Sequence, residues 1–294
     1  MNSVVKLALP VLFALACASG PAWAAPILGP NLASFAVLGA AGVTNVAVST
    51  IGGNLGSSPN AAVGGGYIFT SGSLQANTAI AASAQIELDA AILAVNAVLG
   101  GTSIVGGNLD LFQTNNGGFI LPGTYDVGAA STNLVGTLIL DGGGSNSAVW
   151  RFRFLSTLIT STTSNVIVQN VGDGANVGLY WTVGTAATIN GPTFAGNVLA
   201  KNLISSDGDL TVTCGRLLSA ESQVTLIHDR VSITGCGNSS GGYDQGASIG
   251  SGGTGGSNGQ VVPEPATGLL VGMALAGLLA TGLKFKRRPR PVMA

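Results

Sequence analysis

A short repeat between residues 185 and 234 constrains the fold more than any other feature of this sequence. Three segments that begin at Thr193, Thr211 and Val231 mix apolar and hydroxyl residues, and they start 18 and 20 residues apart. A second set of short apolar runs lies between them, at 187–189, 203–205 and 224–226. Two strand-like segments in each unit of about 20 residues predict a β-solenoid, because each coil can bury its inward side chains only against the next coil.

The repeat is less regular upstream. A Gly-x-(Leu/Val) signature recurs at Gly53, Gly107, Gly136, Gly196 and Gly215. The separations of 54, 29, 60 and 19 residues do not follow one period, although 60 corresponds to three coils and 54 leaves room for a helix. We therefore expect a mainly β protein, built as an irregular solenoid with an insertion.

Residues 74–99 have a different pattern. Apolar residues recur there at steps of three or four, at Ile80, Ala84, Leu88, Ala91, Val95 and Val98. Alanine is abundant and Gly100-Gly101 supplies a stop, so the pattern predicts one helix over about 74–99 with an apolar face. This helix must lie along the solenoid to bury that face. Strands are expected before it, at 33–39 and 43–51, and again from residue 106 onward.

The composition supports a turn-rich β protein. The chain contains 46 Gly in 294 residues, with 46% hydrophobic and 8% charged residues. That much Gly without a Gly-X-Y triplet excludes collagen, and the abundant Val, Ile and Leu argue against disorder. Residues 25–262 include five basic and eleven acidic residues, which leaves a formal charge of −6. The sequence therefore predicts no nucleic-acid partner, because phosphate binding needs a basic surface.

Residues 1–24 have the form of a signal peptide. A lysine is followed by an apolar run at 7–16 and then by Ala22-Trp23-Ala24, which matches the small-x-small site of signal peptidase. The apolar run is too short to favour an N-terminal membrane anchor, so we expect export with cleavage after Ala24. Cys17 is a weak lipoprotein candidate and leaves with the signal peptide.

Cleavage leaves two cysteines, Cys214 and Cys236, in an exported chain. They are 22 residues apart and fall at equivalent edges of neighbouring predicted coils. The sequence therefore predicts a disulfide between stacked coils, with two free buried thiols as the alternative.

The C-terminus combines a linker with an apolar segment and a basic tail. Residues 237–261 are rich in Gly and Ser and predict a flexible linker. Residues 266–283 are apolar, and these 18 residues are about 27 Å long as a helix, just enough to span a membrane. The basic cluster at 284–290 should stay cytoplasmic. Pro263-Glu264-Pro265, the apolar segment and the basic tail resemble, in this order, the PEP-CTERM sorting signal, over 262–294.

This resemblance implies processing by an exosortase-type membrane protease. It also implies a cell-surface or extracellular-matrix protein of a Gram-negative bacterium that makes exopolysaccharide. A permanent C-terminal membrane anchor is the alternative.

Residues with catalytic chemistry are sparse. His228 is the only histidine, and Asp229 beside it would point to the opposite face of a strand. Asp207-Gly208-Asp209 could supply oxygens to Ca²⁺, but the further carboxylates of a calcium site are not evident. The triple-glycine runs at 64–66 and 142–144 lack the lysine and the strand-loop-helix context of a phosphate loop. We therefore predict a protein that is not an enzyme, with no metal or other cofactor.

The exported body resembles a known family from about Ile27 to Thr234. The resemblance is carried by an ordered set of segments, namely 33–39, 52–56, the alanine-rich helix, 122–125, 150–152 and 196–200. This set is similar to the bacterial and fungal ice-binding-like adhesion domain, here over residues 25–236. The resemblance implies a right-handed β-solenoid of triangular section with a long helix packed along one side. The resemblance also implies ice binding through a flat solenoid face, as in the characterised members.

Strand alternation gives a candidate face. Four predicted strands, at 156–160, 186–190, 202–205 and 223–226, should lie side by side. Alternation places eight uncharged residues outward: Thr157, Ile159, Ala186, Thr188, Asn202, Ile204, Gln223 and Thr225. Because coils stack at about 4.8 Å, short hydroxyl, amide and methyl groups there could hold surface water in an ice-like order. Thr is also simply a good strand former, so no single position indicates ice binding.

Two functions stay open from the sequence. The leading hypothesis is an exported, non-enzymatic protein whose partner is the surface of an ice crystal. The rival is an adhesin or matrix component on the same fold, whose partner is extracellular polysaccharide. The uncharged face favours the first function, and the sorting signal favours the second.

Overall fold

The computed structural model describes residues 26–234, 236 and 242–245, and all of them belong to one compact unit of the chain. The predicted signal peptide (1–24), most of the predicted linker (237–261) and the predicted sorting signal (262–294) with its apolar segment lie outside the described residues.

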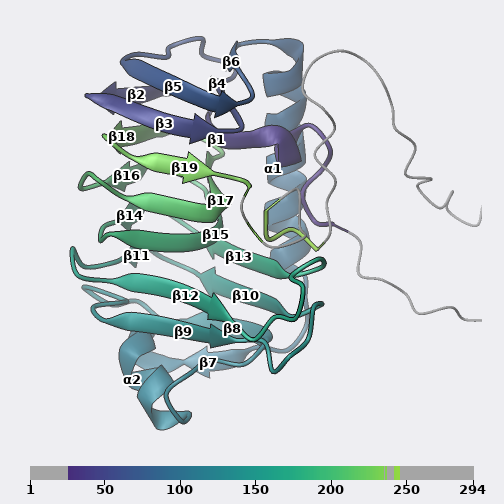
Figure 1. Ribbon diagram of the computed structural model, residues 1–294, viewed down its shortest axis with the longest axis vertical. Helices are drawn as coiled ribbons and strands as arrows, with labels where there is room; N and C mark the ends of the chain where they lie inside the picture. The colour runs from purple at the N-terminus through teal and green to yellow at the C-terminus, as the bar shows by residue number, and fades with distance from the viewer. Residues whose placement is uncertain (1–25, 235, 237–241, 246–294) are drawn as a thin grey trace, which may run out of the picture. The chain divides into compact units, whose positions relative to one another are not determined.

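The described residues form stacked coils of parallel strands, with a long helix along the outside (Figure 1). One sheet has five strands and is called the five-stranded face. In spatial order it consists of β11 (Leu158–Ile159), β14 (Ala187–Ile189), β16 (Ile204–Ser206), β18 (Gln223–Ile227) and β2 (Gly42–Val46). The other sheet has 14 strands and bends at irregularities in β15 (Thr193–Ala200) and β17 (Thr211–Ser219), which gives it two faces.

Both faces of the larger sheet share β15 and β17. The helix-covered face contains their second halves with β6 (Leu74–Ala76), β4 (Asn54–Ser57), β1 (Phe35–Gly39), β13 (Gly178–Val183), β10 (Val149–Phe154), β8 (Gly123–Val127) and β7 (Thr102–Ile104). The second open face contains their first halves with β5 (Gly66–Ser71), β3 (Val48–Gly52), β19 (Arg230–Ser232), β12 (Asn165–Gln169) and β9 (Thr137–Asp141). The structure thus confirms a mainly β fold of parallel sheets.

The path of the chain brings its two ends together. The helix α1 (Ala79–Asn96) follows β6 at one end of the stack and leads to β7 at the other end, from which the chain climbs back coil by coil (Figure 1). As a result β1 pairs with β17, β2 with β18 and β3 with β19, all in parallel. The first coil of the sequence therefore lies directly on the last one.

The interior of the coils is apolar. Tyr125, Phe152 and Trp181 are register partners on β8, β10 and β13, and their rings stack with centroids 5.2 and 4.3 Å apart. The ring of Phe194 continues the series at 5.0 Å from Trp181. Each such contact contributes about 0.5–1.5 kcal/mol beyond the burial of apolar area. Stacked aromatic rings therefore hold the coils of β8, β10, β13 and β15 in register.

The long helix confirms most of the predicted apolar face, but it starts later and ends earlier than predicted, so that Val98 lies beyond its last residue, Asn96. Its buried residues are Ala81, Ala84, Leu88, Ala91 and Val95, which pack on the helix-covered face. It begins at Ala79 because Leu74–Ala76 pairs as β6 with β4, and the Thr78 hydroxyl oxygen caps it by accepting a hydrogen bond from the Ala81 N–H. By length and composition α1 could also cross a membrane, but here its apolar stripe is covered by the solenoid.

Two other elements differ from the sequence expectation. The predicted strand at 43–51 divides into β2 and β3 at Ala47, whose φ of 64° turns the chain between two faces. The helix α2 (Leu109–Asn115) stands where only strands were predicted, and the Asn108 side chain caps it by accepting a hydrogen bond from the Leu111 N–H at 2.8 Å. Two single-turn 3-10 helices complete the elements, at Leu32–Ser34 and Val105–Gly107.

The predicted disulfide is confirmed. Cys214 and Cys236 are bonded, with their Cα atoms 5.4 Å apart. After the disulfide, residues 242–245 pack against β13, although the sequence predicted that they belong to the linker. Gly178 forms an antiparallel β-bridge with Asp244, and the Leu179 N–H donates a hydrogen bond to the Tyr243 carbonyl. The folded unit therefore extends past the predicted boundary at 236.

Asp244 ties both ends of the described chain to the solenoid. One carboxylate oxygen accepts hydrogen bonds from the Ile27 N–H at 3.1 Å, the Leu28 N–H at 3.2 Å and the Tyr180 hydroxyl at 2.6 Å. Burial raises the pKa of Asp244 to about 6, although Arg216 and these hydrogen bonds act to lower it. Burial also lowers the pKa of Arg216 to about 10, so its guanidinium stays charged at neutral pH. We call Asp244 and the residues around it the terminal clasp, which consists of Ile27, Leu28, Tyr180, Arg216 and Asp244.

Candidate functional site

The five-stranded face presents one continuous outward row. Register pairs place five residues side by side across the coils: Ile159, Thr188, Ser205, Thr225 and Thr44. Their sequence neighbours form the matching inward row, which is fully buried: Leu158, Ala187, Ile204, Val224 and Val43. The alternation of strands thus produces an apolar floor under a row of hydroxyl and methyl groups.

Hydrogen bonds join members of the outward row from one coil to the next. The Thr44 hydroxyl donates to the Thr225 hydroxyl at 3.1 Å, and the Ser205 hydroxyl donates to the Thr188 hydroxyl at 3.5 Å. The strand pairings of this face run without a register shift. Because neighbouring strands lie about 4.8 Å apart, the row repeats at a nearly fixed spacing.

Six of the eight residues predicted for this face are exposed or half-buried on its strands or at their ends: Thr157, Ile159, Ala186, Thr188, Gln223 and Thr225. The other two predictions, for Ile204 and Asn202, are wrong about where the residue lies. Ile204 pairs with Ala187 and Val224 and is fully buried, so it points inward. Asn202 lies in the turn before β16, where its N–H donates to the Thr185 carbonyl.

The outward position on β16 belongs to Ser205. The chain turns one residue later than the pattern of this segment indicated, which moves every residue of the strand to the other side. Sequence reasoning also missed Thr44, because its strand belongs to the first coil and comes beside β18 only through the return path of the chain. A clue was present in the alternation of 42–46, which is apolar at Val43 and hydroxyl-bearing at Thr44.

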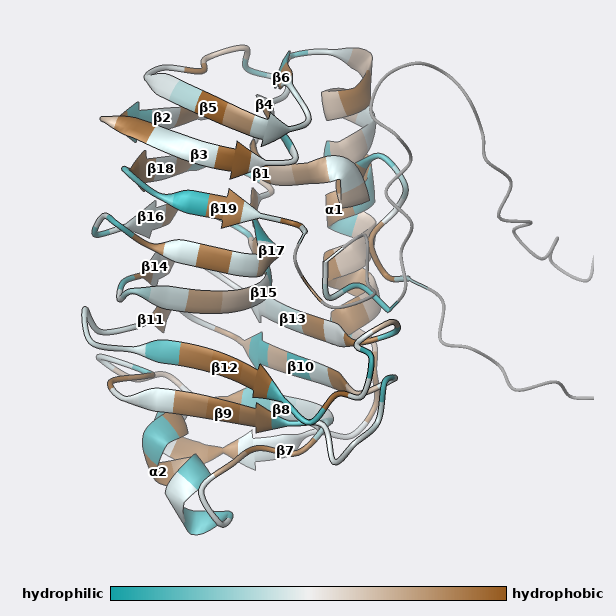
Figure 2. Ribbon diagram, viewed as in Figure 1, coloured by the Kyte–Doolittle hydropathy of each residue, from teal (hydrophilic) through white to brown (hydrophobic). Residues whose placement is uncertain are grey.

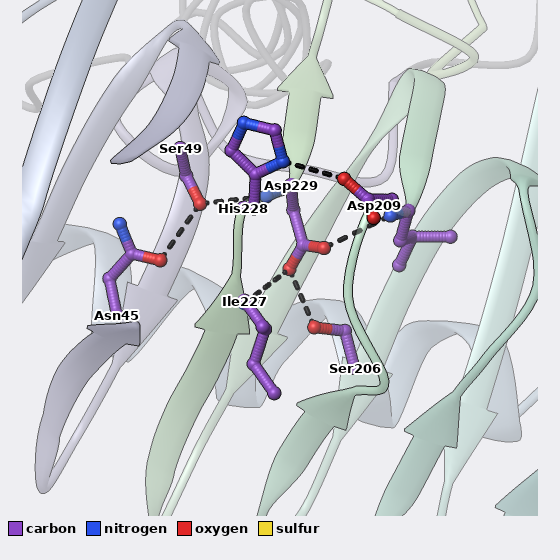
Figure 3. A network of polar contacts seen from close by, with 8 residues as sticks. Asn45, Ser49, Ser206, Asp209, Ile227, His228 and Asp229 are labelled. Atoms are coloured by element: carbon purple, nitrogen blue, oxygen red, sulfur yellow. Dashed lines mark hydrogen bonds and ion pairs between the residues drawn. The ribbon is translucent and has the colours of Figure 1, made fainter. Parts of the chain in front are cut away.

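Charged residues border the five-stranded face but do not enter its rows. At one border the Lys201 ammonium and Glu221 carboxylate lie 3.7 Å apart and are both exposed. At the other border His228 Nδ1 lies 2.6 Å from an Asp209 carboxylate oxygen (Figure 3). Asp207, two residues before Asp209, is also exposed. The long charged side chains therefore lie at the corners of the coil.

The second open face has its own row. Register pairs align Thr137, Asn165, Thr193, Thr211, Arg230, Thr50 and Ile68. The exposed Arg230 interrupts the hydroxyl and amide groups, and Figure 2 shows β19 beginning with this hydrophilic residue. Next to the row, Ile139 pairs with Ile167, which is 45% exposed, so the β9 and β12 end is apolar.

The groups considered for chemistry do not converge on a reaction site. The partner of His228 is Asp209 on the neighbouring coil, whereas Asp229 is buried in a separate hydrogen-bond network. Within residues 26–234, 236 and 242–245, no three His, Cys, Asp or Glu side chains gather as a metal site requires. A hollow of about 660 Å³ lies beside α1, lined by Ile92 and Phe154 among others, and not on the five-stranded face.

Comparison with known proteins gives a consistent result. A family model described as Ice-binding-like matches residues 37–232. A protein from Nostoc sp. (strain HG1), described as an ice-binding protein, is 33% identical over 202 residues, which is 68% of this chain and 71% of the relative.

Solved structures of ice-binding proteins share the fold. One from the Antarctic ascomycete Antarctomyces psychrotrophicus is 28% identical with a TM-score of 0.59, covering 71% of this chain and 98% of the other. One from an Antarctic biological consortium is 26% identical with a TM-score of 0.60, covering 78% and 96%. A glycosylated one from an Arctic yeast, at 21% identity and a TM-score of 0.55 over 71% and 94%, adds support for the fold alone.

Proposed function

This chain belongs to the ice-binding-like family, and we propose that it binds ice through its five-stranded face. The activity is adsorption to a crystal and not catalysis. One observation carries the choice of face: an uncharged outward row runs across all five strands in unbroken register.

The physical basis is the order that the face imposes on water. Thr, Ser and Ile side chains are short, and their β-branched members keep few rotamers, so the row is rigid. Hydroxyl groups at a repeat of about 4.8 Å anchor water molecules, while the methyl groups between them leave the neighbouring waters to bond to one another. A layer ordered in this way can merge with the surface of a growing crystal.

The test is ice-affinity partition of the purified protein combined with a measurement of freezing hysteresis. An ice binder is enriched in the frozen fraction and lowers the freezing point below the melting point. Exclusion from the ice together with no hysteresis would contradict the proposal.

A second function is favoured by the C-terminal sequence. The PEP-CTERM-like segment suits a matrix protein or adhesin, and the partner would then be extracellular polysaccharide. Retention on exopolysaccharide beads without enrichment in ice would select this function.

The finer features of fold and location are also proposals. Three faces suit a coil of triangular section, and crossover connections between parallel strands are right-handed in about 98% of cases. Export by the signal peptide agrees with a family whose members are typically secreted.

We further infer that an exosortase-type protease removes the segment after Pro263-Glu264-Pro265 in a Gram-negative host. Mass spectrometry of surface material that recovers intact peptides from 269–294 would instead establish a lasting anchor.

A further inference from the structure

One corner of the coil is built from strained positions. Ala47, Asp209 and His228 are equivalent residues on three neighbouring coils, where the chain passes from the five-stranded face to the second open face. Their φ angles are 64°, 55° and 54°, a left-handed conformation that costs a residue with a side chain roughly 1–2 kcal/mol. Such a corner persists only if surrounding contacts hold it.

Asp229 provides these contacts from inside the corner. Its side chain is 1% exposed. The carboxylate accepts hydrogen bonds from the Ser206 hydroxyl at 2.6 Å, the Ile227 N–H at 3.0 Å and the Leu210 N–H at 3.1 Å (Figure 3). Ser206 and Leu210 belong to the coil on one side, so the carboxylate joins that coil to its own.

The backbone of Asp229 reaches the coil on the other side. Its N–H donates to the Ser49 hydroxyl at 2.8 Å, and that hydroxyl donates to the Asn45 side-chain oxygen at 2.9 Å (Figure 3). The Asn45 amide in turn donates to the Ala47 and Gly66 carbonyls. A single residue thus links three consecutive coils at the edge of the five-stranded face.

The strands of this face need such a link because they are short. β16 and β18 are paired only at Ile204 with Val224 and at Ser205 with Thr225. A slip of one residue would turn the whole strand over and bury its outward side chain. Ser206 and Asn45, which belong to the network, directly follow the outward residues Ser205 and Thr44.

Burial of a carboxylate is unfavourable in itself. Burial raises the pKa of Asp229, and the nearby Asp207 acts in the same direction, while the three hydrogen bonds lower it. An apolar side chain in its place would leave the Leu210 and Ile227 N–H groups without this acceptor. The hydrogen bonds that the carboxylate accepts therefore offset the free-energy cost of burying it.

We propose that Asp229 is a positioning residue, which holds Ser205, Thr225 and Thr44 in the register that ice adsorption requires. This inference rests on the proposed ice-binding function. Asp229 itself is buried and touches no ice.

The test compares Asp229→Asn with the matched control Asp209→Asn. In the first variant an NH₂ group replaces one acceptor oxygen and faces N–H and O–H donors, so the network must rearrange. The control makes the same chemical change at the same corner, but Asp209 is exposed and its pair with His228 contributes little. Ser206→Ala serves as a milder variant that removes one donor, in case Asp229→Asn does not fold.

Hysteresis and amide hydrogen exchange are measured near 0 °C on samples that circular dichroism shows to be folded. For Asp229→Asn we expect loss of most of the hysteresis and exchange about tenfold or more faster in β16 and β18, as follows from one lost buried hydrogen bond. Ser206→Ala should lie in between, and Asp209→Asn should match the wild type.

The outcomes separate this inference from the function beneath it. If the wild type adsorbs to ice and folded Asp229→Asn adsorbs equally well, the inference is overturned even if its melting temperature falls. A wild-type protein that does not adsorb would overturn the proposed function and this inference together.

Discussion

The two open faces of the solenoid are built by the same coils and yet differ in what they present to solvent. Both carry rows of Thr and other short side chains at strand spacing, and the row on the second open face crosses more strands. That row contains Arg230 and ends beside the apolar pair Ile139 and Ile167. Its pairing of β3 with β5 also shifts register between Ile51 and Gly52. The five-stranded face has neither a charge in its rows nor a shift.

This difference shows that the number of threonines does not identify a binding face. Charge placement and unbroken register separate the faces, since a long charged side chain keeps its own hydration and holds a flat crystal away. Substitutions on each face and at the corners of the coil test which of these two properties determines ice adsorption.

The largest effect is expected from a bulky side chain on the five-stranded face. Thr188→Tyr or Thr225→Tyr should remove most of the freezing hysteresis, because a protruding ring separates the neighbouring coils from the crystal. The inward residues stay packed, so the free energy of unfolding should change by only about 0.5 kcal/mol. Hysteresis and chemical denaturation measure the two quantities.

The matched controls are Thr211→Tyr and Ser232→Tyr on the second open face, where both residues are half-buried on paired strands. They should retain hysteresis close to that of the wild type. If they abolish ice adsorption while the Thr188 and Thr225 variants retain it, the second open face and not the five-stranded face binds ice.

Removing the disulfide should change stability without changing adsorption. Cys214 and Cys236 lie away from the five-stranded face and close a loop of 22 residues. The chain-entropy model gives a loss of about 3 kcal/mol for the double change to Ser, with a lower melting temperature. Hysteresis near 0 °C should persist as long as the protein is folded. A loss of adsorption by folded protein would show that the binding face extends to this corner.

The terminal clasp should make stability depend on pH. The pKa of Asp244 is raised to about 6, so the folded state binds its proton more tightly than the unfolded state does. The free energy of unfolding should therefore fall, by at most about 3 kcal/mol, as pH rises from about 4 to about 7. Denaturation across this range measures the slope.

Asp244→Asn should flatten this slope. A residual decrease comes from Asp229, whose pKa burial also raises. Stability that rises with pH over this window would mean that Asp244 is ionised without penalty in the folded protein.

The smallest effect concerns Arg230. Arg230→Thr completes the row on the second open face and should change stability by no more than about 0.5 kcal/mol. We expect a slight gain in hysteresis, because the interrupting charge is gone while the apolar end and the register shift persist. No gain would indicate that register, and not charge, separates the faces.

The sequence predicted the repetitive parts of this molecule and missed what depends on distant contacts. Coil length, the apolar stripe of α1 and the pairing of Cys214 with Cys236 follow from periodicity and spacing. The phase of β16 does not, because a strand of three residues is too short to define its own alternation. The network of Asp229 escaped prediction because Ser49 lies 180 residues away in the chain.

The stacking of the first coil on the last one has a consequence for how the protein folds. The Thr44–Thr225 hydrogen bond joins residues 181 positions apart. Such long-range pairing raises contact order and slows folding, because the entropy of closing a large loop must be overcome before any contact forms. β1, β2 and β3 emerge first during synthesis, but their partners β17, β18 and β19 are among the last strands made. We therefore expect β2 to pair with β18 late in folding, so that this edge of the five-stranded face forms last. An incompletely exported chain should expose unpaired strand edges, which favour aggregation.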